Sequence, residues 1–334
     1  MRSIRFPAYV GGVLILALAL GVYFFQVYRQ GSPQTVSSER SHVESLFSGR
    51  TPAEALALFK NENATGTSAE EHTAAHLFGE ALYRQEGLDG FSVCDGSFGF
   101  GCYHSFLGLA IAEHGPDVVK KLDEGCVRAY GPQGTGCFHG IGHGVLAYYG
   151  YGFADVGRAL SLCAQLSWKG QMSGCSDGVF MEYNFRVMEK DPTKKSRPFT
   201  MSERYEPCLS VREYPQACYF GLGSWWATAL PQDASLSSRM GEFCAKVKRE
   251  DLRRACYRGI GYGILPQLRF EAEPGEAFCD AVATGVARVW CREGMAWAFY
   301  ADPATRDKAH DVCTRGLSQS EAGQCDKEYL FATQ

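Results

Sequence analysis

The sequence predicts an all-α protein built from disulfide-stapled two-helix repeats, arranged as an α-solenoid or a partly closed α/α toroid. Three observations predict this fold: evenly paired cysteines, a glycine-rich sequence after most second cysteines, and a repeat length that suits two helices. Apolar residues make up 46% of the 334 residues, which excludes a disordered chain. The formal net charge of −4 gives no electrostatic footprint for nucleic acid, so no nucleic-acid partner is expected.

The 14 cysteines fall into consecutive pairs whose members are 8 to 12 residues apart. An even number at regular short spacing is typical of a disulfide framework, which persists in oxidising compartments. The C-x2-C spacing of zinc–thiolate sites does not occur. Closing a loop of this size stabilises a fold by roughly 3 kcal/mol in the chain-entropy description. The predicted disulfides are Cys94–Cys102, Cys126–Cys137, Cys163–Cys175, Cys208–Cys218, Cys244–Cys256, Cys279–Cys291 and Cys313–Cys325.

The first cysteines of the pairs recur every 32 to 45 residues, which predicts about seven units within residues 51–334. In each unit we expect a helix A that ends near the first cysteine and a helix B that begins at the second. Glycine inside a helix costs about 0.5–1 kcal/mol relative to alanine. Glycines three and five residues after the second cysteine, as in the run from Cys256 to Gly261, therefore predict close backbone contact between stacked B helices. The longest interval contains a charged loop insertion at 189–198.

At the level of architecture, this pattern resembles helical repeats of the Sel1 or tetratricopeptide type. The detailed sequence patterns of those families are absent. The resemblance therefore implies stacked helix pairs and no particular function.

The N-terminal region predicts a membrane anchor. Residues 7–28 carry no charge and are long enough to span a bilayer as a helix, although a cleaved signal peptide is the alternative. Arg2 and Arg5 favour a cytoplasmic tail at 1–6, followed by a signal anchor at 7–28 and a polar stalk at 29–50. The expected protein is a single-pass membrane protein whose C-terminal domain lies in the periplasm or the extracellular space.

Histidines gather on one face of neighbouring B helices. Positions +2 and +6, counted from the second cysteine of a unit, share a helix face. His104 and His139 occupy +2 of the first two units, and His143 occupies +6 of the second. An upstream segment without a cysteine has the same H-x3-H spacing, and aligning it places His72 and His76 at +2 and +6 of a preceding unit.

This histidine face predicts a transition-metal site on the concave face of the repeats. Imidazole suits Zn, Cu or Fe, and paired cysteines leave no competing thiolate. Asp177, at +2 of the third unit, would add a carboxylate ligand or orient an imidazole. The alternatives are histidines that hydrogen-bond between helices and a polar ligand site without metal. The predicted metal-site residues are His72, His76, His104, His139, His143 and Asp177.

A catalytic metal ion needs an open position and a nearby base. The candidate bases are Asp177, Glu80 and Glu182, so a metal-dependent enzyme is one interpretation. Nucleotide and serine-hydrolase chemistry are not expected, because the P-loop, the Rossmann fingerprint and the G-x-S-x-G elbow are absent. Covalent c-type haem is not expected either, because no C-x-x-C-H sequence occurs.

The C-terminal half carries an aromatic and charged set near the same face. Such a set suits an extended peptide or a glycan, and the alternative is a packed core at the repeat contacts. The competing functional hypothesis is a metal-free scaffold that holds an extracytoplasmic protein partner at the membrane. The predicted partner-face residues are Trp225, Trp226, Arg258, Tyr262, Glu293 and Trp297.

Overall fold

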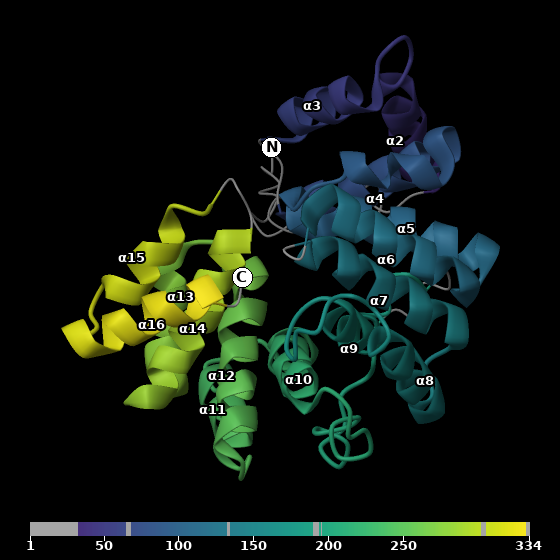
Figure 1. The fold of residues 1–334 in the computed structure, drawn as a ribbon. Coiled ribbons are helices and arrows are strands. Elements are labelled where there is room, and N and C mark those ends of the chain that lie inside the picture. The colour runs from purple at the N-terminus through teal and green to yellow at the C-terminus, as the bar shows by residue number, and fades with distance from the viewer. Residues whose placement is uncertain are drawn as a thin grey trace, which may run out of the picture.

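The computed structural model describes residues 33–64, 68–131, 134–189, 194, 196–301 and 305–331, which within these ranges form helices and turns and no strand. The predicted all-α class is therefore confirmed for this part of the chain. The B helices each pack on the next one along the chain (Figure 1). The stack begins with α4 (Ser68–Glu86), which has no cysteine. The seven B helices follow it: α5 (Gly101–His114), α7 (Thr135–Tyr149), α9 (Cys175–Phe185), α10 (Pro215–Ala229), α12 (Glu250–Ile264), α14 (Val286–Ala301) and α16 (Gln319–Phe331).

No A segment is longer than the B helix that follows it. They comprise the 3-10 helix η1 (Gly87–Val93) and the helices α6 (Val119–Tyr130), α8 (Phe153–Cys163), α11 (Leu236–Ala245), α13 (Ala272–Val282) and α15 (Lys308–Thr314). In the fourth unit, consecutive turns at 201–210 take the place of helix A. The remaining elements are α2 (Pro33–Leu46), α3 (Pro52–Asn63) and the 3-10 helices η2 (Ser97–Phe100), η3 (Pro116–Val118) and η6 (Leu265–Leu268).

All seven predicted disulfides are confirmed. Each joins an A segment, or the turns that replace it, to the following B helix, with Cα–Cα distances of 5.3 to 5.8 Å. The 14 cysteines are all paired, so no thiolate is available as a metal ligand. Each repeat unit is therefore cross-linked by one disulfide bond.

The predicted close backbone contact between B helices is also confirmed. A Cβ atom on Gly142 would lie 2.1 Å from the carbonyl oxygen of Cys175, and one on Gly178 would lie 2.0 Å from that of His139. The glycine at +5 of one helix thus faces the next helix, whose glycine at +3 faces back. The same reciprocal contact recurs at Gly223, Gly259, Gly261 and Gly294.

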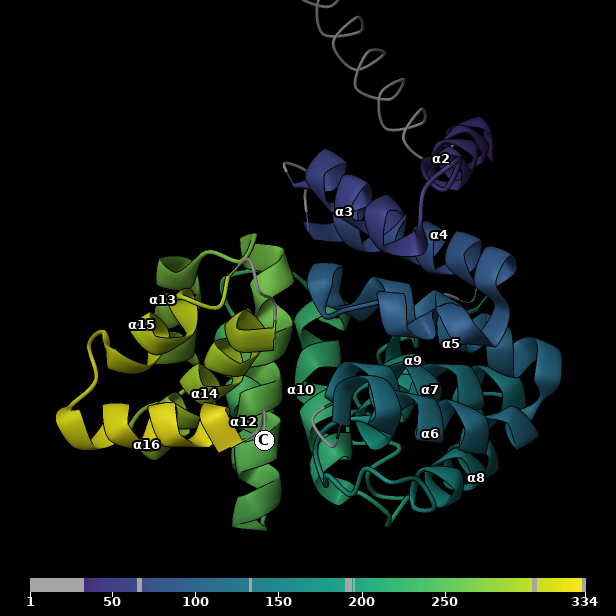
Figure 2. The same cartoon turned by 45° about the horizontal axis from the view of Figure 1, so that its top comes forward.

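The stack of B helices is curved. The rings of Phe220 in α10 and Trp297 in α14 have centroids 4.9 Å apart, although α12 lies between these helices in the chain. A Cβ atom on Gly96 would lie 3.1 Å from the carbonyl oxygen of Ala301. In Figure 2, α10 and α12 lie between the blue N-terminal helices and the yellow C-terminal ones. The B helices therefore curve so that the first unit contacts the end of α14.

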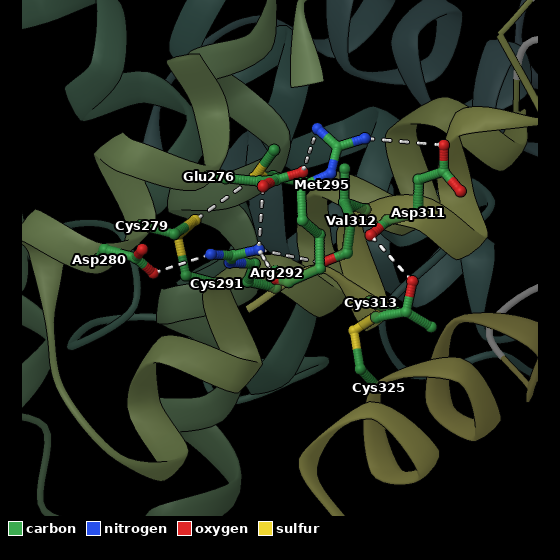
Figure 3. A network of polar contacts seen from close by, with 12 residues as sticks. Glu276, Cys279, Asp280, Cys291, Arg292, Met295, Asp311, Val312, Cys313 and Cys325 are labelled. Atoms are coloured by element: carbon green, nitrogen blue, oxygen red, sulfur yellow. Dashed lines mark hydrogen bonds and ion pairs between the residues drawn. A yellow bond between two sulfur atoms is a disulfide. The ribbon is translucent and has the colours of Figure 1, made fainter. Parts of the chain in front are cut away.

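A buried arginine joins the last two units (Figure 3). Arg292 in α14 is 2% exposed and donates to Asp280 Oδ1 at 2.9 Å, and it pairs with Glu276 at 3.5 Å. Its guanidinium also donates to the carbonyl oxygens of Val312 and Arg315, at 3.3 and 2.9 Å. Because a buried charge is tolerated only when it is paired, this network fixes α15 against α13 and α14.

The predicted membrane placement is corrected. In the described ranges, no helix combines the length and the apolar character that crossing a bilayer requires, which contradicts the expected single-pass topology with a cytoplasmic N-terminus. The tail at 1–6 and the anchor at 7–28 lie outside the described residues. Within the expected stalk at 29–50, α2 forms and buries Val43 and Leu46 in the core. The seven disulfides still fit an oxidising, extracytoplasmic compartment.

We expect Gly261→Ala to destabilise the fold by about 1–3 kcal/mol, because its Cβ would overlap a carbonyl oxygen of α14. The distance to that oxygen, on Cys291, would be 1.9 Å. Gly157→Ala in α8 is the matched control, since its Cβ would meet no atom within 4 Å. Denaturant unfolding under oxidising conditions measures both. Equal free energies of unfolding for the two variants would contradict the close-packing account.

Candidate metal centre

Five histidines from α4, α5 and α7 form two overlapping groups. One ring nitrogen from each of His72, His76 and His104 lies within 4.8 Å of the others, and this set is called the first triad. His104, His139 and His143 meet the same criterion and form the second triad. The three helices are neighbours in the stack (Figure 1). The structure therefore brings all five predicted histidines to one place, with His104 shared.

In the first triad, the imidazole nitrogens are spaced like the ligands of one ion. The Nε2 atoms of His72 and His76 are 3.0 Å apart, and His104 Nδ1 lies 3.4 Å from His76 Nε2. Two nitrogens on a tetrahedral zinc ion are about 3.3 Å apart, given bonds of 2.0–2.1 Å. A neighbour holds the other nitrogen of each α4 histidine: His72 Nδ1 lies 2.8 Å from the carbonyl oxygen of Phe98, and His76 Nδ1 lies 2.8 Å from Ser105 Oγ.

In the second triad, two carboxylates of α9 hold the outer ring nitrogens. The Nε2 atoms of His139 and His143 are 3.0 Å apart. His139 Nδ1 pairs with Asp177 Oδ2 at 2.9 Å, and His143 Nδ1 pairs with Glu182 Oε2 at 2.8 Å. Metal-binding histidines characteristically use their second nitrogen in this way, which fixes the ring and raises its basicity.

Hydrogen-bond chemistry decides where some of the lone pairs lie. The carbonyl of Phe98 can only accept, so His72 carries its hydrogen on Nδ1 and a lone pair on Nε2. That lone pair is available to a hydrogen on His76 or to a metal ion. His104 Nε2 is different, because it is buried and has no hydrogen-bond partner among the described residues. An unpaired buried polar atom costs about 1–3 kcal/mol, which a bound ion would remove.

Burial favours the neutral form of three of the histidines. His104 and His143 have pKa values well below the usual range, first because burial disfavours the charged ring and second because other histidines lie nearby. Burial likewise lowers the pKa of His72. Since only the neutral imidazole can bind a metal ion, the buried centre favours the ligand form near neutral pH.

Glu182 is fully buried behind the second triad. Burial raises its pKa to about 8, and the hydroxyl of Tyr151 and the backbone N–H of Met188 donate to it at 2.6 and 3.1 Å. This location suits a group that positions His143. The base role expected of Glu182 requires contact with a substrate, which full burial does not provide.

The other two candidate bases lie in different surroundings. Glu80 forms ion pairs with Arg40 and Arg84, one helical turn after His76. Asp177 lines a cavity of about 240 Å³ together with His139. The same cavity is also lined by Tyr262, Trp297 and Tyr300 from the C-terminal half. The second triad therefore adjoins this cavity through His139, whereas His72 and His76 of the first triad are themselves only partly buried.

The register expected for α4 is wrong. A Cβ atom on Gly79 would lie 2.3 Å from the carbonyl oxygen of Cys102, the contact that other units make at +5. His76 and Glu80 are therefore at +2 and +6, and His72 lies one turn earlier. Helix packing through glycine sets the register, whereas the H-x3-H spacing alone fits either alignment.

Two of the predicted partner-face residues lie in the core, which was the alternative expectation for this set. Trp225 and Trp226 are 1% and 0% exposed, because the segment after α9 folds over them. The Trp225 indole N–H donates to the carbonyl of Arg197, whose guanidinium also stacks on the indole ring. The Trp226 indole donates to the carbonyl of Arg204. Both side chains belong to the core.

The remaining partner-face residues divide into two sets. Glu293 is 2% exposed and accepts hydrogen bonds from Arg254 and Arg258 at 2.9 and 2.7 Å, so it joins α12 to α14. Tyr262 and Trp297 line the same cavity as His139. Of the predicted set, these two aromatic residues are the ones placed to contact a ligand in the cavity.

Sequence reasoning did not identify the groups behind the first triad. Phe98 adopts a φ of 55°, in the left-handed region, and this backbone turns its carbonyl toward His72. No sequence signal marks that contact. Ser105 did carry a signal, because it stands at +3, where the following five units have glycine.

No family model matches the chain, and no curated protein and no solved structure matches it. The functional argument therefore rests on the geometry of the site.

We expect Glu182→Gln to lower metal affinity about 10–100-fold, because it removes the carboxylate that orients His143. The amide keeps the size of the side chain. Glu44→Gln is the control, since its carboxylate is 47% exposed on α2. Competition titration with a chromophoric zinc chelator measures the affinity. Unchanged zinc affinity in the Glu182 variant would show that the second triad does not bind the ion.

Proposed function

We propose that this protein is an extracytoplasmic helical-repeat protein, a partly closed α/α toroid, that binds a transition-metal ion at the centre formed by α4, α5 and α7. One observation carries the proposal: five imidazoles converge, and the Nδ1 atoms of four are held from outside. The buried, unpartnered Nε2 of His104 supports it further.

The available donor atoms restrict which metal ions can bind at this centre. Imidazole nitrogens suit Zn, Cu or Fe, and carboxylates lie behind the rings. Because every cysteine is in a disulfide, thiolate cannot contribute. Ca²⁺ and Mg²⁺ are disfavoured, since these ions prefer oxygen ligands.

The cavity beside His139 supports a metal-dependent reaction on a small molecule. It gives access to the second triad, and Asp177 is the one candidate base that lines it. An ion held by three histidines keeps an open position for water or substrate. In this proposal, Asp177 orients His139 and accepts a proton from a ligand in the cavity.

The aromatic side chains that line this cavity support an alternative, metal-free function. Tyr262, Trp297 and Tyr300 would stack on a sugar or on a peptide side chain of an extracytoplasmic partner. The Trp297→Ala variant separates the two functions. Loss of ligand binding with the metal content unchanged would favour the aromatic site as the functional one.

Elemental analysis of the full chain tests the metal proposal. The chain is purified oxidised and without a histidine tag. We expect near-stoichiometric Zn, Cu or Fe, and we expect His139→Ala with His143→Ala to lose the ion of the second triad. His42→Ala with His310→Ala is the matched control, because those side chains are 58% and 64% exposed. Absence of metal even after reconstitution would overturn the proposal.

A further inference from the structure

His104 lies between the other four histidines. Its ring centroid is 4.3 and 5.2 Å from those of His143 and His139, and 5.3 Å from those of both His72 and His76. It is 2% exposed, so solvent does not separate it from either pair. It is also the member that both triads share.

The two nitrogens of His104 have different surroundings. Nδ1 faces His76 Nε2 at 3.4 Å and belongs to the first triad. Nε2 is buried and has no hydrogen-bond partner among the described residues. The two nitrogens of an imidazole point in different directions, so one ion can bind only one of them. A single ion in either triad would therefore leave the other histidine pair without its third ligand.

We infer that the centre holds two transition-metal ions bridged by the imidazole of His104, an inference that rests on the proposed metal-binding function. The first ion binds His72 Nε2, His76 Nε2 and His104 Nδ1. The second binds His139 Nε2, His143 Nε2 and the remaining nitrogen of His104. Each ion keeps one open position in a tetrahedral site.

Bridging changes the proton count of His104 by one. When one triad alone is filled, the neutral ring keeps its one N–H on the nitrogen that faces the empty triad. Binding of an ion to the empty triad breaks this N–H bond, the freed nitrogen lone pair binds the ion, and the proton leaves to solvent. The ring becomes an imidazolate, and neither ion changes its oxidation state.

The two triads differ in their supporting charges. Asp177 and Glu182 lie behind the second triad, whereas a carbonyl and a hydroxyl lie behind the first. An ion on the Nε2 atoms favours the ionised form of both acids, and the carboxylates then make the imidazoles more basic and balance the charge of the ion. The second triad therefore binds more tightly and fills first, and it is also the one that opens to the cavity.

Copper titration with electron paramagnetic resonance tests the bridge. The full chain is stripped of metal, kept oxidised and titrated with Cu²⁺. We expect two Cu²⁺ per chain. The first equivalent gives the full signal of an isolated ion, and the second removes most of that signal, because an imidazolate couples the two unpaired spins.

Substitutions identify the bridge. We expect His104→Ala to restore an integrated EPR intensity that accounts for all of the bound Cu²⁺. His72→Ala with His76→Ala and, separately, His139→Ala with His143→Ala should each retain one uncoupled ion, which keeps the test valid if His104→Ala does not fold. His42→Ala with His310→Ala serves as the control and should bind two coupled ions.

The outcomes separate the two claims. Binding of one Cu²⁺ by the unmodified chain overturns the bridge and leaves the proposed function intact. Two ions with a full, uncoupled signal overturn the bridge as well. Loss of all copper in either double variant also overturns it, since that result indicates one mixed site. If the unmodified chain binds no copper, zinc or iron, the proposed function fails together with the bridge.

Discussion

The close approach of neighbouring B helices is the constraint on which the rest of the structure depends. Gly142 in α7 and Gly178 in α9 leave room for the carbonyls of the facing helix, and Gly79 does the same between α4 and α5. A side chain at these positions would push the helices apart, because packed helices do not absorb an extra methyl group. Only at this separation can the imidazoles of three helices share one centre.

The disulfides determine both the fold and the chemistry of the site. The first and fourth units have little regular helix before the B helix, and a covalent bond fixes each of these segments. The oxidising compartment that allows these bonds also removes thiolate from the possible ligands. Imidazole is then the donor suited to a transition metal, and the buried carboxylates Asp177 and Glu182 are left to orient it.

The features that the sequence predicts correctly are those that depend on short spacings between cysteines or glycines. Cysteine spacing predicted each disulfide, and the glycines after the second cysteine predicted the helix contacts. The register of α4 was missed because that segment has no cysteine to fix its phase. For Trp225 and Trp226 the sequence left a partner face and a packed core both open, because the covering segment after α9 reaches them through long-range packing. The contact from Phe98 to His72 depends on a left-handed backbone that no residue pattern specified.

A cluster of five histidines, beside a cavity that His139 lines, is the feature that distinguishes this protein. The most direct test of its role is a crystal structure of the metal-loaded chain with data collected across the metal absorption edge. The account predicts anomalous density within bonding distance of the Nε2 atoms of His139 and His143. Imidazoles that hydrogen-bond to one another, with no anomalous density between them, would contradict it.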